Sequence, residues 1–228
     1  MNDAARNACR LIAITDDIRD GRDGLTARAL AAMRGGATMI QVRLKHVDTR
    51  SLAEVARALV TALPIPVVIN DRADVAMAVG AAGVHVGSDD LPVSALRRIT
   101  PQGFIVGVSV GSDTEAAGAA GADYAGIGPV YGSGSKLDAG TAIGVSEFGR
   151  LAALVQLPAV AIGGITAETA PPVIAAGATG VAVIAAIFGR PDPEAAAREL
   201  RVAIDRAQPA TRSATRAEPR SPLSATES

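Results

Sequence analysis

The sequence is short of the residues on which several functional classes depend. It has no Trp, one cysteine and two histidines, and aromatic residues make up only 2% of it. So few rings argue against a surface that stacks nucleic-acid bases, and a net charge of -1 argues against a broad basic field. The single Cys9 excludes an intrachain disulfide framework and is typical of a reducing compartment. With so little histidine and cysteine, no zinc-site pattern is visible.

Long hydrophobic runs are also missing. Hydrophobic residues form 49% of the chain, but glycine, proline and charged residues divide them into short segments. The least charged stretch, Pro158–Gly189, predicts buried strands and a helix and not a membrane span. Met1–Arg10 lacks the apolar core of a signal peptide. We therefore expect a soluble cytoplasmic protein whose partners are neither nucleic acid nor membrane. The sequence leaves open whether it forms a homo-oligomer.

Short strand-like runs alternate with helical segments along most of the chain. The expected strands are Leu11–Thr15, Thr38–Val42, Val67–Asn70, Gly83–Val86, Ile105–Val110, Tyr124–Gly128, Ala159–Ile162 and Gly180–Ile184. The expected helices are Gly24–Arg34, Arg50–Ala62, Ala73–Gly80, Val93–Ile99, Asp113–Ala120, Val145–Val155, Ala167–Ala176 and Pro193–Ala207. Alternation of this kind predicts a parallel sheet, and the number of units favours a single (β/α)8 TIM barrel.

This barrel is expected to occupy residues 11–207, after an N-terminal extension at 1–10. Residues 208–228 are rich in Pro, Ser, Thr and Arg, which predicts a disordered tail. A doubly wound open sheet is the alternative fold. It is disfavoured because Thr15-Asp16-Asp17 stands where a dinucleotide fold carries a glycine-rich turn.

Polar residues alternate at the end of the second expected strand. Gln41, Arg43 and Lys45 share one face by the period of two, and Ile40, Val42 and Leu44 share the other. If the apolar face packs under helices, the polar face points into the barrel. Two cations there are costly without a partner, which predicts an anion site.

Two carboxylates follow neighbouring strands. Asp71 and Asp90 are suited to a hard divalent cation, since Mg²⁺ commonly takes one or two carboxylates plus phosphate oxygens and water. Alternatively, each caps the helix that follows it. Together with Arg43, Lys45 and Lys136 in one barrel mouth, they favour a metal–diphosphate site.

A second anion site is predicted from the last strands. The loop Gly128–Lys136 offers backbone amides, hydroxyls and one cation, and Gly163-Gly164 permits close backbone approach. Ala185–Phe188 is a candidate for the short helix that binds phosphate in many barrels. Small inward positions at Gly107 and Gly126 predict a cavity at the mouth. His85 is interpreted as a hydrogen-bonded structural residue.

Taken together, these segments resemble the thiamine phosphate synthase (thiamine-phosphate pyrophosphorylase) family, which includes thiazole tautomerases. The segments that carry the likeness are Gln41–Lys45, Ile69–Arg72, Gly83–Leu91, Gly107–Ser109, Gly128–Lys136 and Ala161–Ile165. The resemblance implies a transferase that condenses 4-amino-2-methyl-5-(diphosphooxymethyl)pyrimidine with thiazole phosphate. Its products would be thiamine phosphate and diphosphate.

The resemblance also implies roles for individual residues. Arg43 and Lys136 would be catalytic, and Asp71 and Asp90 would hold Mg²⁺ as cofactor. The implied substrate-binding residues are Gln41, Val42, Arg43, Leu44, Lys45, Asn70, Ser109, Ser133, Gly134, Ser135, Lys136, Gly164, Ile184 and Ala185.

The chain departs from the family pattern at several positions. Leu44 stands for an acidic residue, Ser88 for Gln, Ser133 and Ser135 for Thr, Ala185 for Ser, and Gly111 for a frequent His. Two other functions therefore stay open. A thiazole tautomerase would need neither diphosphate nor metal, and the retained Asp71, Asp90 and Lys136 argue against it. A non-catalytic barrel that binds a phosphorylated ligand would suit the changes at Leu44 and Ala185.

Overall fold

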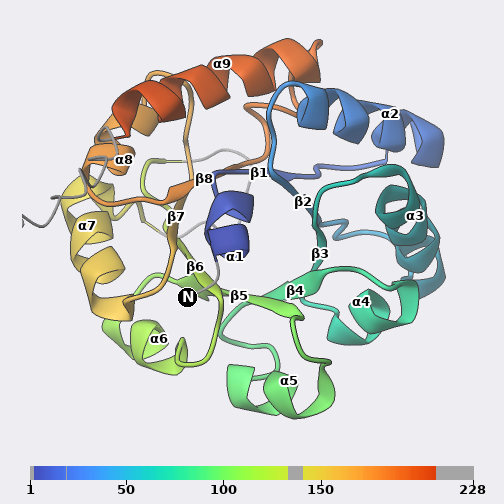
Figure 1. The fold of residues 1–228 in the computed structure, drawn as a ribbon, viewed down its shortest axis with the longest axis horizontal. Coiled ribbons are helices and arrows are strands. Elements are labelled where there is room, and N and C mark those ends of the chain that lie inside the picture. The colour runs from blue at the N-terminus through green and yellow to red at the C-terminus, as the bar shows by residue number, and fades with distance from the viewer. Residues whose placement is uncertain (1–2, 19, 133–140, 209–228) are drawn as a thin grey trace, which may run out of the picture.

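Eight parallel strands close into a barrel in the computed structural model, which describes residues 3–18, 20–132 and 141–208. Each strand pairs with its sequence neighbours, and β8 pairs with β1 (Figure 1). The strands are β1 Leu11–Ile14, β2 Met39–Val42, β3 Val67–Asn70, β4 Gly83–Val86, β5 Ile105–Val110, β6 Tyr124–Ile127, β7 Ala159–Ile162 and β8 Gly180–Val183. The predicted (β/α)8 barrel is confirmed.

Helices surround the ring of strands (Figure 1). The helices around the barrel are α2 Gly21–Arg34, α3 Thr49–Ala62, α4 Ala73–Val79, α5 Val93–Ile99, α6 Asp113–Gly118, α7 Gly144–Val155, α8 Ala170–Ala175 and α9 Pro193–Ala207, and a further helix, α1 Asp3–Ala8, precedes them. Strands β3, β4, β5 and β7 have the predicted bounds. Helix α8 begins three residues later than expected (Ala167 predicted, Ala170 found), because the Thr166 amide donates to Thr169 Oγ1 in a preceding turn.

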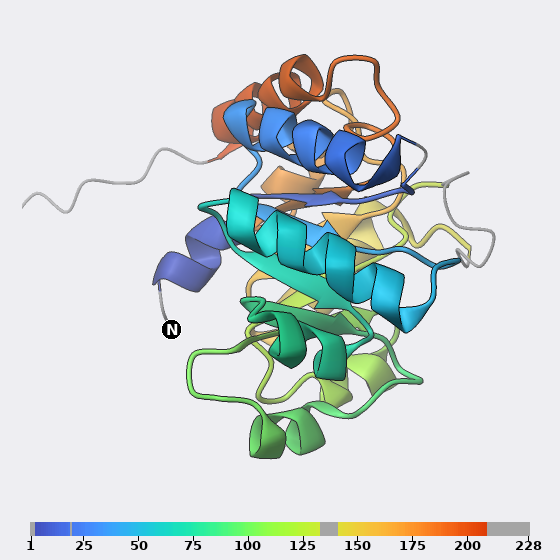
Figure 2. The ribbon, with the colours of Figure 1, turned by 90° about the vertical axis from the view of Figure 1, so that its right-hand side faces the viewer.

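Helix α1 precedes the barrel and lies at one end of it (Figure 2). It is too short and too polar for a sequence pattern to reveal, and we had expected only an extension there. Its last residue is fixed by Thr38, whose hydroxyl contacts the Ala8 carbonyl at 2.9 Å and accepts from the Leu11 amide at 2.9 Å. Ala8 and Cys9 are buried against the inside of the barrel. The amino end of the barrel is therefore closed.

The two ends of the barrel chain meet where β1 pairs with β8. Arg10, just before β1, forms an ion pair of 2.6 Å with Asp205 near the end of α9. The expected tail at 208–228 lies outside the described residues apart from Gln208. No described helix has the length and apolar character needed to cross a membrane.

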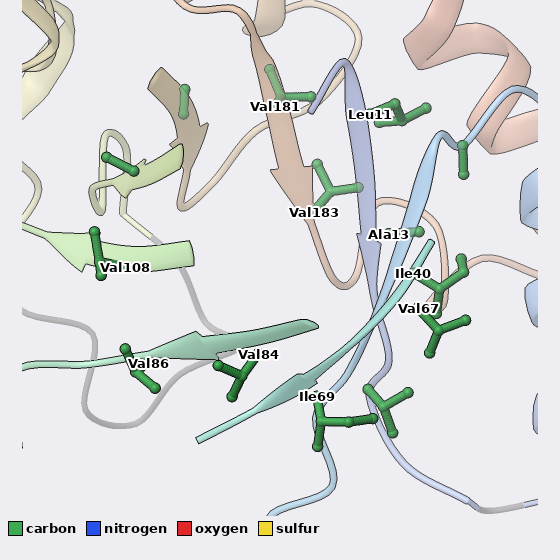
Figure 3. Packing of buried hydrophobic residues seen from close by; sticks show 14 of the residues in the cluster. Leu11, Ala13, Ile40, Val67, Ile69, Val84, Val86, Val108, Val181 and Val183 are labelled. Carbon is green, nitrogen blue, oxygen red and sulfur yellow. The ribbon is translucent and has the colours of Figure 1, made fainter. Parts of the chain in front are cut away.

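The buried apolar residues of the strands form two separate cores. One face packs under the helices, as the side chains of Leu11, Ile40, Val67, Ile69 and Val84 show (Figure 3). The other face fills the barrel interior, with a cluster made of Ala8, Cys9, Ile12, Ile14, Met39, Val68, Tyr124, Val160 and Ala182. Ala8 and Cys9 bring this cluster to the amino end, and the inward positions at the ends of β2 to β5 lie toward the carboxyl end, where barrel active sites occur.

Candidate active site

The inward faces of β2 to β5 become polar toward their carboxyl ends. Ile40 and Val42 pack in the outer core, so Gln41 between them faces the interior, as the period of two predicted. Gln41 is only 4% exposed, and its side-chain amide donates to Oδ1 of Asn70 at 2.7 Å. This bond joins two of the predicted substrate-binding residues from neighbouring strands.

Arg43 lies one residue beyond β2 and is half-buried. Its backbone is held by Thr15, a fully buried residue at the end of β1 that the sequence analysis did not single out. Alternation continues past the strand, since Leu44 packs against the outer core and Lys45 is exposed. The side chains of Val42 and Leu44 thus point away from the mouth, and their predicted substrate contacts stay untested.

Asp71 and Asp90 stand after the neighbouring strands β3 and β4. The helix-cap alternative is wrong for both, because Arg72 and Pro92 are the residues at the N-caps and neither makes a side-chain cap bond. Asp71 instead adopts a left-handed backbone with φ of 64°, and its amide donates to the His85 carbonyl at 2.7 Å. A left-handed residue other than glycine is uncommon and often marks a functional site.

Asp90 closes the turn that follows β4. Its Oδ2 accepts a hydrogen bond from the Gly87 amide at 2.8 Å. The two carboxylates follow strands that pair directly, with Asn70 beside His85. Within the described ranges no group of three His, Cys, Asp or Glu side chains forms a metal cluster.

The prediction of a cavity is wrong at two glycines, because aromatic rings occupy the space there. A Cβ on Gly107 would lie 2.2 Å from the Tyr124 ring, and one on Gly126 would lie 3.1 Å from His85. His85 contacts Tyr124 Oη through Nδ1 at 3.0 Å and Ser109 Oγ through Nε2 at 3.1 Å. This confirms His85 as a hydrogen-bonded residue. It also identifies Tyr124, which sequence reasoning missed.

The residues after β8 form one helical turn and not the short helix that the sequence predicted. The amides of Phe188 and Gly189 donate to Ile184 and Ala185 at 2.9 and 3.2 Å. The preceding amides, those of Ala185 and Ala186, donate to no backbone carbonyl of the described residues. Free amides at the start of a turn suit a phosphate group.

Arg28, from α2, braces this turn against the end of β1. Its guanidinium lies 5.6 Å from the centre of the Phe188 ring and donates to Asp16 Oδ1 at 2.9 Å. A further bond goes to the Asp17 carbonyl at 3.1 Å. The Arg28 side chain is only 13% exposed. No motif had suggested this residue, because its contact with Phe188 spans 160 positions of the sequence.

The glycine pair after β7 approaches the loop that follows β6. A Cβ on Gly163 or Gly164 would lie 2.6 or 2.7 Å from that loop, and the Tyr131 amide donates to the Gly163 carbonyl at 3.0 Å. The sequence predicted a close backbone approach at this glycine pair, and the backbone that approaches it belongs to the loop after β6. The predicted residues Ser133, Gly134, Ser135 and Lys136 lie outside the described residues.

The family model for thiamine monophosphate synthase matches residues 11–187. A thiamine-phosphate synthase from Methanoculleus marisnigri is 49% identical over 197 residues, covering 84% of this chain and 93% of that protein. One from Roseiflexus castenholzii is 46% identical over 192 residues, covering 82% and 84% respectively.

Solved structures give the same picture. A thiamine phosphate pyrophosphorylase from Pyrococcus furiosus has a TM-score of 0.79 and 36% identity, covering 89% of this chain and 98% of its own. A 3-hexulose-6-phosphate synthase has a TM-score of 0.66 at 21% identity, which shows a shared fold alone. The family model spans nearly the whole barrel, and relatives above 45% identity cover more than four fifths of the chain. The chain belongs to the thiamine monophosphate synthase family.

Proposed function

We propose that the protein is a thiamine phosphate synthase, a transferase that joins the pyrimidine diphosphate to thiazole phosphate and releases diphosphate. The observation that carries this proposal is the pairing of two anion-binding features at one end of the barrel. Gln41, Arg43 and Asn70 place polar groups at the ends of β2 and β3, and the turn after β8 begins with two amides that donate to no backbone carbonyl of the described residues. Membership of the family supports the same reaction.

The diphosphate of the pyrimidine would lie against the ends of β2 to β5. Arg43 and Lys45 supply positive charge there, and the Gln41–Asn70 pair supplies further polar groups. Asp71 and Asp90 fit Mg²⁺ by their chemistry, since both offer carboxylate oxygens at the ends of paired strands. Mg²⁺ bound to them would neutralise charge on the departing diphosphate.

The phosphate of the thiazole would bind at the turn after β8. Ala185 offers its amide there, Ile184 leads into the turn, and Gly164 lies two residues beyond β7. Ala185 lacks the hydroxyl that the family often has, so recognition here rests on backbone amides and charge. Ser133, Gly134, Ser135 and Lys136 are proposed to complete this site from the loop after β6.

The reaction needs charge stabilisation more than a strong base. Loss of diphosphate builds negative charge on the leaving group and positive charge on the pyrimidine carbon, which the thiazole nitrogen then attacks. Arg43 and Lys136 are placed by this proposal against the leaving group, where fixed cations favour its departure. The interior of the barrel below them is filled by the buried apolar cluster around Ile12, Met39 and Val68.

One incubation tests the proposal. The purified protein is given both substrates with Mg²⁺, and thiamine phosphate and diphosphate are quantified together. We expect equal amounts of both products, and a lower yield of both at limiting Mg²⁺ in Asp71→Asn. Isomerised thiazole phosphate without diphosphate would instead indicate a tautomerase. Tight binding of both ligands with no product would indicate a non-catalytic barrel.

A further inference from the structure

Hydrogen bonds link Tyr124, His85 and Ser109 in a continuous series across the barrel interior. The strand register places His85 of β4 beside Gly107 of β5, and Gly107 beside Tyr124 of β6. Because Gly107 has no side chain, the Tyr124 ring lies over it and reaches His85 two strands away. The ring centroids are 5.4 Å apart. The two rings can therefore touch because Gly107, between them, has no side chain.

The hydroxyl of Tyr124 determines which group donates in each hydrogen bond of this series. Tyr124 is 1% exposed, and its one hydrogen-bond partner among the described residues is Nδ1 of His85 at 3.0 Å. Burial raises the pKa of Tyr124 well above its ordinary value, so the phenol keeps its proton. A buried O–H without an acceptor is costly, and the phenol therefore donates to Nδ1.

This direction sets the tautomer of His85. When Nδ1 accepts, a neutral imidazole carries its proton on Nε2. Nε2 lies 3.1 Å from Oγ of Ser109, so Nε2–H donates to that oxygen. The proton of Ser109 is then available to a further acceptor in the mouth of the barrel. In the reverse direction Ser109 would donate to His85 and offer only a lone pair to the ligand.

We propose that Tyr124 is a positioning residue that fixes the Nε2–H tautomer of His85 and thereby presents Ser109 to the pyrimidine substrate as a hydrogen-bond donor. This rests on the proposed function, in which Ser109 contacts that substrate. The acceptor on the substrate is a diphosphate oxygen or a ring nitrogen, which both lack protons. Tyr124 acts from the closed side of the barrel and touches no substrate itself.

The tautomer can be measured without substrate. The chain has only two histidines, so ¹⁵N-labelled imidazoles give few signals, and His46→Gln assigns them. We expect the Nε2–H form of His85 in the unmodified protein and a mixture of tautomers in Tyr124→Phe, which keeps the ring over Gly107. Tyr131→Phe removes the same atom elsewhere and should leave the His85 signals unchanged.

A second variant distinguishes a positioning role of Tyr124 from a general effect on folding. Ser109→Ala removes the far end of the series but leaves Tyr124 in place, so His85 should retain the Nε2–H form. In kinetics, Tyr124→Phe should raise KM for the pyrimidine diphosphate by about fivefold, the scale of one neutral hydrogen bond. KM for thiazole phosphate should not change.

The proposal is overturned if His85 is Nδ1-protonated in the unmodified protein, or if Tyr124→Phe leaves the tautomer unchanged. It is also overturned if both KM values rise equally. A protein that makes no thiamine phosphate would refute the proposed function, while the NMR measurement would still decide the role of Tyr124 toward His85.

Discussion

The hydroxyl of Thr15 binds both backbone polar groups of Arg43. Its oxygen accepts from the Arg43 amide at 2.8 Å, and its proton goes to the Arg43 carbonyl at 3.2 Å. Thr15 is fully buried, and Arg43 lies just beyond the last residue of β2. One side chain directly after β1 thus fixes the backbone of the proposed diphosphate-binding arginine.

Replacing this hydroxyl should affect stability and substrate binding together. Thr15→Val keeps the shape but leaves a buried amide and carbonyl unpaired, which should lower the free energy of unfolding by about 1–3 kcal/mol. KM for the pyrimidine diphosphate should rise, because the Arg43 backbone is no longer held. Thr15→Ser retains the hydroxyl and serves as the matched control. Urea unfolding and steady-state kinetics measure both effects, and identical kinetics in the two variants would refute the role.

Adjacent residues on opposite faces should differ sharply. Arg43→Ala removes a cation from the proposed leaving-group site and should lower kcat by about 10²-fold or more. Leu44→Glu changes a side chain that packs on the outer core and should have a mild effect on turnover. Rates of diphosphate release compare the two. If Leu44→Glu were the more damaging variant, the assignment of inward and outward faces would be wrong.

The proposed Mg²⁺ ligands can be tested against a neighbour. Asp71→Asn and Asp90→Asn each remove one charge, and asparagine tolerates the left-handed backbone at position 71. Both variants should need more Mg²⁺ for half-maximal activity. Asp89→Asn, at an exposed adjacent position, should not. Activity is titrated with Mg²⁺ after chelation, and an unchanged Mg²⁺ requirement in all three would exclude this site.

Replacing Arg28 should weaken binding of the thiazole phosphate more than binding of the pyrimidine diphosphate. Arg28→Met removes the bonds to Asp16 and Asp17 and the charge over the Phe188 ring. The turn after β8 then loses its brace, and KM for thiazole phosphate should rise of order tenfold. Arg22→Met, at an exposed position on the same helix, is the control. Equal changes in both KM values would argue for a general loss of structure.

Cys9 should be chemically inert while the protein is folded. Burial, and then the charge of Asp123, raise the pKa of its thiol from 9.0 to about 12. The unfolded chain releases this proton near its ordinary pKa, so the free energy of unfolding should fall as pH rises from 9.0 toward 12. Alkylation followed by mass spectrometry should show modification only after denaturation. In Cys9→Ala, the free energy of unfolding should fall less steeply with pH above pH 9.0.

The barrel was predictable because its information is local. Apolar runs broken at regular intervals located every strand, and the polar residues at the strand ends located the mouth. The bounds of β3, β4, β5 and β7 matched because each run ends abruptly in glycine, a charged residue or a polar residue.

Contacts between distant strands were not predictable in the same way. Gly107 predicted open space, but Tyr124 fills it from the next strand. The bond from Thr15 to Arg43 likewise depends on how β1 and β2 are placed relative to each other. A buried threonine at a strand end was the only signal. The helix-cap reading of Asp71 failed because its left-handed backbone cannot be inferred from residue type.

The ion pair between Arg10 and Asp205 has a consequence for rearranging the chain. It holds the start of β1 beside the end of α9, although the two residues are 195 positions apart. Where two ends of a domain adjoin, a short linker can join them and new ends can be opened at another surface loop. Circularly permuted forms of this barrel can therefore place new termini away from both the mouth and α1.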